Sequence, residues 1–134
     1  MSTIKELKLN SFSDERGSLI AIEAEKDVPF KINRTYYMYN LSANNPRGFH
    51  AHKNLEQFVI CLQGSCQIKL DDGFKENHFT LDSPKKGLII RKLIWREMYN
   101  FKDNCILMVL ASHHYDEDDY IRNYNDFIDH IRSG

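Results

Sequence analysis

Short stretches of β-forming residues, separated by turn-forming residues, recur along most of the chain. Several of these stretches are rich in Val, Ile, Tyr and Phe, whose side chains favour extended strands. Clusters of Asp, Asn, Gly and Pro between them are typical of turns. Many short strands at this spacing indicate a β-sandwich or a β-barrel. We expect strands at residues 5–12, 18–24, 34–41, 57–62, 65–70, 78–81, 87–92, 95–101 and 105–111.

The hydrophobic period changes near the C-terminus, after the acidic residues 116–119. From there apolar side chains recur at steps of three and four residues, which is the period of an amphipathic helix. Acidic residues at the start of a helix interact favourably with its dipole. We therefore expect one C-terminal helix over residues 116–132, packed on the β-domain by Tyr120, Ile121, Tyr124, Phe127, Ile128 and Ile131.

The size and charge of the chain limit its class. Its 134 residues contain no linker, repeat or low-complexity tract, so we expect one domain over residues 1–134. A net charge of −1 gives no overall positive field for nucleic acid or an anionic membrane. No signal peptide and no apolar run of roughly 18 residues is found, which predicts a cytoplasmic protein. The three cysteines lie in strand-like stretches and are interpreted as buried thiols.

Two histidines alternate with a small residue in the segment Gly48-Phe49-His50-Ala51-His52. On a strand, His50 and His52 point to the same face, and such a pair inside a barrel indicates a functional site. The segment resembles the metal motif of the cupins, which are small jelly-roll β-barrels. In this chain, however, Gln57 stands at the spacing of the glutamate ligand, and Arg96 stands where the second motif supplies another histidine.

The two replacements remove two of the ligands that a cupin uses to bind a metal. A neutral amide is a poor substitute for an anionic ligand, and a guanidinium repels a divalent cation. The chain also lacks a Gly-rich dinucleotide loop. We therefore predict no metal and no other cofactor, and we interpret His50 and His52 as groups that transfer protons.

Several other side chains are candidates for binding a substrate. Arg16, Arg47 and Lys53 lie in or beside segments that a barrel could bring to one mouth, where three cations could hold a diphosphate. Taken singly, each is a solvated surface charge. Tyr37 could donate a hydrogen bond to a sugar oxygen, and Trp95 could line the pocket beside Arg96, although both residues also suit packing.

Four segments of the chain are similar to the dTDP-4-keto-6-deoxyglucose 3,4-ketoisomerases. They are Asp14-x-Arg16-Gly17-Ser18-Leu19, the block Pro-Arg-Gly-Phe-His-Ala-His-Lys at 46–53, Leu-Asp-Ser-Pro at 81–84, and a tail with Leu110-Ala111-Ser112 and Tyr120-Ile121-Arg122. The resemblance covers nearly the whole chain. It implies an all-β, metal-free cupin with one C-terminal helix, which binds a dTDP-linked keto sugar and forms a homodimer with exchanged N-terminal strands. It also implies a role in making deoxyamino sugars for bacterial surface glycans.

The family resemblance implies an isomerase that moves a keto group from C4 to C3 through an enediolate, and these residues suit that chemistry. We assign His50 as the base that removes the C3 proton and His52 as its relay or orienting partner. The family members that form the gluco product resemble this chain at Arg96, and those that form the galacto product resemble it at Arg16. We favour dTDP-3-keto-6-deoxy-D-glucose, with the galacto epimer as the alternative, because Arg96 should line the pocket.

Three other functions fit parts of the same pattern. A dTDP-sugar 3,5-epimerase carries a similar Asp-x-Arg-Gly segment and would also exchange the C5 proton. A metal-dependent cupin would hold a stoichiometric ion. A non-catalytic sugar-nucleotide-binding cupin would bind the substrate without converting it.

Overall fold

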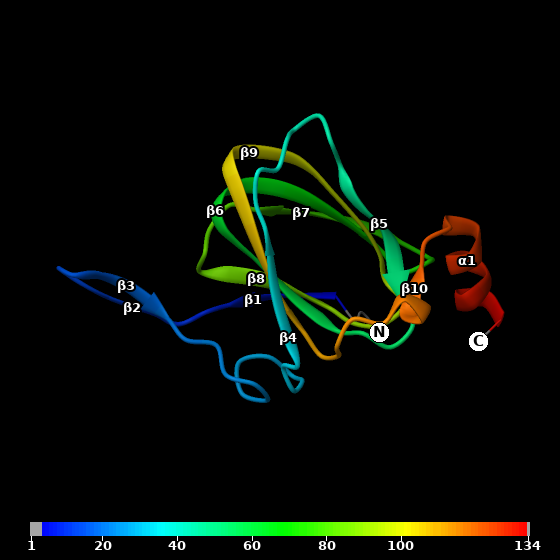
Figure 1. The fold of residues 1–134 in the computed structure, drawn as a ribbon, viewed down its shortest axis with the longest axis horizontal. Coiled ribbons are helices and arrows are strands. Elements are labelled where there is room, and N and C mark those ends of the chain that lie inside the picture. The colour runs from blue at the N-terminus through cyan, green and yellow to red at the C-terminus, as the bar shows by residue number, and fades with distance from the viewer. Residues whose placement is uncertain (1–3, 134) are drawn as a thin grey trace.

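The structure, a computed structural model, describes residues 4–133. Almost all of its regular elements are β-strands, as the sequence predicts (Figure 1). The elements in chain order are β1 (Ile4–Lys8), β2 (Ser11–Asp14), β3 (Gly17–Ile20), β4 (Arg34–Met38), β5 (Arg47–His52), β6 (Gln57–Asp71), β7 (Glu76–Leu81), β8 (Lys86–Ile90), β9 (Trp95–Ala111), the 3₁₀ turn η1 (Glu117–Asp119), β10 (Tyr120–Ile121) and α1 (Tyr124–Ser133).

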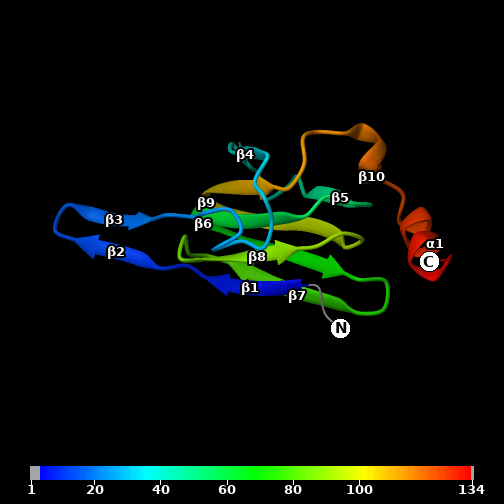
Figure 2. The same ribbon diagram turned by 90° about the horizontal axis from the view of Figure 1, so that it is seen from below.

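Two long antiparallel strands, β6 and β9, form the centre of the barrel. They pair from Gln57 opposite Ala111 to Asp71 opposite Trp95. On β6 the order continues through β8 to β1, and β7 pairs with the second half of β6. On β9, β5 pairs with the first half and β4 with the second. The result is the rolled sheet of a cupin, or jelly-roll, barrel, which confirms the predicted fold (Figures 1 and 2).

The predicted breaks within β6 and β9 are wrong, because both strands continue across them. Residues 63–64 and 102–104 separate the predicted strands and contain turn-forming residues. Instead the ladder shifts register between Cys61 and Gln67 and the strands bend there. Gly64 has a φ of 71°, and a Cβ at this position would lie 2.3 Å from the Lys102 carbonyl oxygen. The turn-forming residues therefore produce bulges that let each strand pass from one side of the barrel to the other.

Alternation along the strands separates two apolar clusters. Val59, Leu88 and Val109 point into the barrel, whereas Phe58, Ile89 and Leu110 point to the outer face of the sheet, where Val28 and Phe30 cover them. The three cysteines are buried in the interior, as predicted. Burial raises the pKa of Cys61 and Cys66 to about 12 and that of Cys105 to about 11, so these groups are thiols rather than thiolates.

The N-terminal segment forms two separate pieces rather than one strand over 5–12. β1 pairs with β8 of the same chain, and β2 and β3 then form a hairpin. In both views this hairpin projects away from the barrel, at the end opposite to α1 (Figures 1 and 2). Phe12 and Leu19 face each other across it and remain 66% and 61% exposed.

The C-terminal helix is shorter than predicted and begins at Tyr124 rather than at residue 116. The acidic run forms η1 instead, with the Asp116 side chain accepting from the Asp118 N–H at its start. Phe127 on α1 packs with Trp95, Ala51 and Ile121 on the outside of the barrel. Among residues 4–133, no helix has the length and apolar character needed to cross a membrane.

Candidate active site

Strand β5 places both histidines on the inner side of the barrel. His50 and His52 lie on one face, with ring centroids 4.9 Å apart, while Ala51 between them faces α1. The strand reaches this position through a bulge, because Gly48 pairs with Glu97 and His50 pairs with Arg96, leaving Phe49 unpaired. Gly48 has a φ of 95°, and a Cβ there would lie 2.9 Å from the Arg96 carbonyl oxygen. Only glycine fits this junction without strain.

His50 is held as a neutral base. Its Nδ1 lies 2.9 Å from the Gly48 carbonyl oxygen, which can only accept a hydrogen bond, so the ring proton is on Nδ1 and the lone pair is on Nε2. Burial, with a smaller contribution from the Arg96 cation, lowers the pKa of His50 to about 4. At neutral pH the ring is therefore ready to accept a proton.

His52 lies deeper and is paired with an acidic residue that the sequence did not single out. Its Nδ1 is 3.1 Å from Oδ2 of Asp119, in η1, and its side chain is only 2% exposed. Burial, the Arg96 cation and His50 lower the pKa of His52 to about 2. The Nε2 atom is buried and has no hydrogen-bond partner among the described residues.

The two residues that replace metal ligands bond to each other. The guanidinium of Arg96 donates to Gln57 Oε1 and, at 3.1 Å, to the Ile94 carbonyl oxygen. Gln57 in turn donates from Nε2 to the Tyr36 hydroxyl at 2.8 Å. Burial lowers the pKa of Arg96 to about 10, which still leaves it cationic at neutral pH. Within residues 4–133, no carboxylate forms a salt bridge with this buried cation, although Coulomb attraction reaches it from Asp119.

This donor set does not suit a divalent cation. A guanidinium occupies one ligand position of the cupin motif, and the amide at the other accepts a hydrogen bond from it. No group of three or more His, Cys, Asp or Glu in the described part of the chain is arranged to hold a metal. The arrangement instead combines a neutral base, a second imidazole and a buried cation.

Two cavities meet at His50. The outer one has a volume of about 340 Å³ and is lined by three arginines, Arg34, Arg47 and Arg122, and no acidic residue. The inner one, of about 20 Å³, ends at Arg96 and Gln57. Both are bordered by Tyr36, Met38, His50 and Met98. A ligand could therefore place an anionic part among the arginines and a polar end near His50 and Arg96.

The structure brings only some of the predicted substrate-binding residues to these cavities. Arg96 and Arg47 line them, but Tyr37 is 65% exposed on the outer face of β4, and its neighbour Tyr36 faces inward. Trp95 also faces outward, where it packs on Phe127 and donates to Glu97 at 2.9 Å. Adjacent residues of a strand face opposite sides, so Trp95 cannot line a pocket that Arg96 lines.

Arg16 and Lys53 do not line the cavities either. Arg16 lies at the turn of the projecting hairpin and is bound to Asp14 at 2.6 Å. Lys53 is exposed just beyond the end of β5. The expected meeting of these two cations with Arg47 does not occur within one chain.

Five residues of the site were missed from the sequence: Tyr36, Arg34, Asp119, Tyr120 and Arg122. The Tyr120 ring lies 5.0 Å from the His50 ring and 4.4 Å from the His52 ring, and Arg122 stacks on it at 4.1 Å. Tyr120 and Arg122 are two residues apart, a strand-like alternation that lies inside the helix predicted over residues 116–132. The Asp119 contact carries no local signal, because its partner is 67 residues away.

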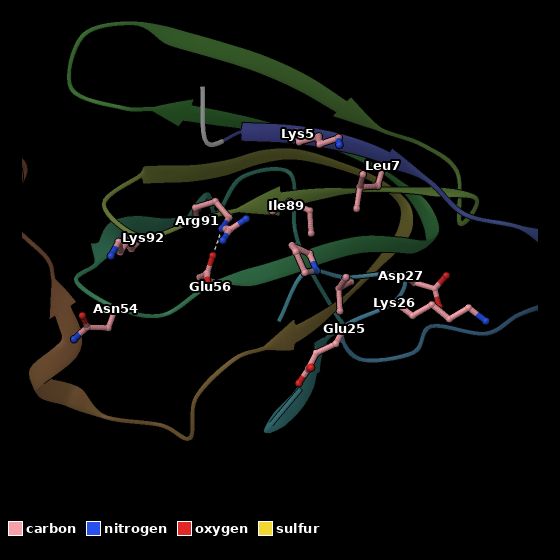
Figure 3. Close-up of a pocket in the computed structure, with 12 residues that line it drawn as sticks. Lys5, Leu7, Glu25, Lys26, Asp27, Asn54, Glu56, Ile89, Arg91 and Lys92 are labelled. Atoms are coloured by element: carbon pink, nitrogen blue, oxygen red, sulfur yellow. Dashed lines mark ion pairs between the residues drawn. The ribbon is translucent and has the colours of Figure 1, made fainter. Parts of the chain in front are cut away.

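A larger cavity, of about 860 Å³, lies on the outer face of the sheet beside β1, β8 and residues 25–29 (Figure 3). Its lining mixes both charges, and Arg91 forms an ion pair with Glu56 across it (Figure 3). None of the residues predicted to form the site lines this cavity. Of the two histidines, His50 borders the smaller cavities inside the barrel, whereas His52 is buried and lines neither of them.

Known proteins match nearly all of this chain. The family model FdtA (WxcM-like, C-terminal) matches residues 2–132. A TDP-4-oxo-6-deoxy-alpha-D-glucose-3,4-oxoisomerase from Aneurinibacillus thermoaerophilus is 50% identical over 95% of this chain and 91% of its own length.

Two solved structures are also close. The TDP-quinovose 3,4-ketoisomerase WlaRB from Campylobacter jejuni is 50% identical, with a TM-score of 0.93 over 96% of this chain and 99% of that one. The 3,4-ketoisomerase QdtA from Thermoanaerobacterium thermosaccharolyticum was solved as a histidine-to-asparagine variant with TDP-4-keto-6-deoxyglucose. It is 41% identical, with a TM-score of 0.96 over 99% of this chain and 96% of that one.

Proposed function

The chain belongs to the FdtA (WxcM-like, C-terminal) family, and we propose that it is an isomerase that moves the keto group of TDP-4-keto-6-deoxyglucose from C4 to C3. One observation carries the proposal: a neutral imidazole, His50, borders the same inner cavity as Arg96, a buried cation with no salt bridge among residues 4–133. That pair suits a reaction in which a C–H proton leaves and negative charge develops on an adjacent oxygen.

The reaction can be followed proton by proton. Nε2 of His50 removes the proton from C3, which the neighbouring C4 carbonyl acidifies, and the electron pair moves to O4 to form an enediolate. His52 moves the hydroxyl proton of O3 to O4. Return of a proton to C4 leaves the carbonyl at C3. The oxidation of C3 is balanced by the reduction of C4 within the same sugar, so no outside oxidant is needed.

Arg96 supplies the electrostatic part of the mechanism. A buried cation without a carboxylate partner is costly, because the desolvation is not repaid by attraction. An enediolate oxygen in the inner cavity would provide that missing charge at the moment it forms. Tyr36 receives a hydrogen bond from Gln57, so its own O–H is free to donate to the same oxygen. Burial raises the pKa of Tyr36 and keeps this hydroxyl protonated.

The outer cavity suits the diphosphate of the nucleotide sugar. Its arginines present planar guanidinium groups, which bind phosphate oxygens in pairs. The relative QdtA was crystallised with TDP and, as a variant, with a TDP-sugar, which supports the same class of ligand for this chain.

We favour the gluco configuration at C4 of the product. Protonation of C4 on the face that lost the C3 proton gives the galacto sugar, whereas protonation from the opposite face gives the gluco sugar. Arg96 stands where a third histidine could have returned the proton on the first face. The name of WlaRB refers to quinovose, the gluco 6-deoxyhexose, which supports this choice.

We also propose a homodimer in the cytoplasm, with N-terminal segments exchanged between protomers. The exposed pair Phe12 and Leu19 on the projecting hairpin supports an arm that packs on a second copy. Because the hairpin points away from its own β5 and β10, Arg16 would serve the partner's site rather than its own (Figure 1).

The test is product NMR with TDP-4-keto-6-deoxyglucose in deuterated water. We expect a 3-keto product labelled at C4. The same reaction in ordinary water, where C4 carries a proton, should show the H4–H5 coupling of an equatorial C4 hydroxyl. An axial hydroxyl would overturn the stereochemical choice alone. Deuterium at C5 would indicate a 3,5-epimerase, and binding without conversion would indicate a sugar-nucleotide sensor. The matched control is His50→Asn, which should bind TDP normally and form no product.

A further inference from the structure

The 3₁₀ turn η1 reaches the proton-relay histidine from the far end of the chain. We propose that Asp119 is a positioning residue that fixes the Nδ1–H tautomer of His52, so that Nε2 accepts a proton from the substrate hydroxyl. The tautomer itself follows from the geometry, and its use in catalysis rests on the proposed function.

The Asp119 carboxylate holds the end of β5 at several points. Oδ2 lies 3.1 Å from His52 Nδ1 and accepts the Leu55 N–H at 3.3 Å, while Oδ1 accepts the Asn54 N–H at 2.8 Å. The Asp119 carbonyl oxygen also accepts the Lys53 N–H at 3.0 Å. Four consecutive residues, 52–55, are therefore bound to one acidic residue, whose side chain is 11% exposed.

This arrangement permits only one neutral form of the ring. A neutral imidazole has one N–H and one lone pair, and a lone pair on Nδ1 would face the carboxylate oxygen and be repelled by it. The proton must therefore lie on Nδ1, which leaves Nε2 as an acceptor. Nε2 is buried and unpartnered within residues 4–133, so its lone pair is not engaged in another hydrogen bond.

The carboxylate also matters when His52 carries a proton in transit. The ring then has two N–H groups and a positive charge beside the buried Arg96 cation. Asp119 is the acidic side chain in hydrogen-bond contact with that ring, so it would stabilise the short-lived imidazolium. His50 has only a backbone carbonyl at the corresponding nitrogen. This difference suits His52 for repeated proton transfer between oxygens.

The surrounding segment is braced in a way that keeps Asp119 in place. Asp116 caps η1, and Glu117 binds Arg122 through two contacts of 2.9 Å. Arg122 stacks on Tyr120, whose ring lies over both histidines. The same short segment thus orients the nitrogen of His52 and covers its ring.

The experiment measures the tautomer directly by ¹⁵N NMR of protein labelled at histidine, without substrate. His52 is identified by comparison with His50→Asn and His52→Asn. In the wild type, we expect Nδ1 of His52 to carry the proton. In Asp119→Asn, the amide cannot accept at both oxygen positions, and its NH₂ facing Nδ1 should favour the Nε2–H form. We expect kcat to fall about 10–100-fold and KM to stay nearly constant.

The control is Asp118→Asn, which removes the same charge from the same turn at an exposed side chain. It should leave the His52 signals unchanged and kcat within about twofold. An Nε2–H tautomer in wild-type protein would overturn the proposal, even if Asp119→Asn does not fold. So would an Asp119→Asn protein with unchanged His52 signals and unchanged kcat. Wild-type protein with the Nδ1–H tautomer but no ketoisomerase activity would contradict the proposed function and leave the tautomer assignment standing.

Discussion

The neutral state of the two site histidines makes the stability of the fold depend on pH. A free histidine has a pKa near 6.5, whereas burial holds His50 at about 4 and His52 at about 2. Between these values the unfolded chain binds protons that the folded protein excludes. The contribution of the neutral rings to the free energy of unfolding is therefore at its full value above about pH 6.5, and it decreases as the pH falls.

This linkage predicts the effect of replacing His50. At pH 5, a single histidine with this shift lowers the free energy of unfolding by about 2 kcal/mol relative to pH 7.5. Thermal or urea unfolding of His50→Asn should therefore show a smaller loss of stability between these pH values than the wild type. His78→Asn, at an exposed position, should retain the wild-type loss. An unchanged pH dependence in His50→Asn would count against a buried neutral base.

At the scale of elements, the bulge in β5 determines which side chains share the cavity. In a regular ladder without the bulge, Phe49 instead of His50 would pair with Arg96, and His50 and His52 would point toward α1. The same alternation separates Arg96 from Trp95 on β9 and Tyr36 from Tyr37 on β4. One glycine junction therefore aligns the base on β5 with the cation on β9.

We predict that Gly48→Ala damages both stability and catalysis. The added Cβ would meet the Arg96 carbonyl oxygen at 2.9 Å in a conformation that L residues rarely adopt, at a cost of about 1–3 kcal/mol. Gly17→Ala is the matched control, since Gly17 also has a positive φ but no atom within 4 Å of the new Cβ. Chemical unfolding should show the larger loss for Gly48→Ala, and assays should show reduced kcat. Equal losses in the two variants would mean that the close contact is relieved by a small backbone shift.

At the scale of the whole molecule, two apolar features lie outside the barrel core. One is the hairpin with Phe12 and Leu19, and the other is the outer face of the sheet. The outer face carries the partly buried residues Leu7, Leu9, Ile22, Ile32 and Met108. Exposed apolar surface of this kind is typical of a protein interface. We propose that the dimer covers both features.

The dimer can be tested at the hairpin. We expect wild-type protein to have the mass of two chains by light scattering after gel filtration, and Phe12→Asp with Leu19→Asp to shift the mass toward one chain. The control is Phe74→Asp, because Phe74 is 83% exposed in the turn between β6 and β7. A monomeric wild type would refute the exchange of N-terminal segments and leave Arg16 without a site.

Much of the fold could be predicted from the sequence because strand propensity, alternation and turn residues act over a few neighbouring positions. The same local patterns identified His50, His52 and Arg96, and they placed both histidines on one face. Local patterns failed where the same residues suit either a turn or a bulge. This happened in β6 and β9, whose bulges contain turn-forming residues.

The tertiary structure decided which of these groups meet. Asp119 reaches His52 across 67 residues, Arg96 bonds to Gln57 across 39, and Gln57 bonds to Tyr36 across 21. Such contacts depend on the path of the whole chain around the barrel, which no local period encodes. The sequence by itself determined a β-barrel with a histidine pair and without two of the metal ligands of a cupin. Only the packed structure determined the partner of Nδ1 in each histidine and the buried cation that faces the two rings, because burial and distance set protonation.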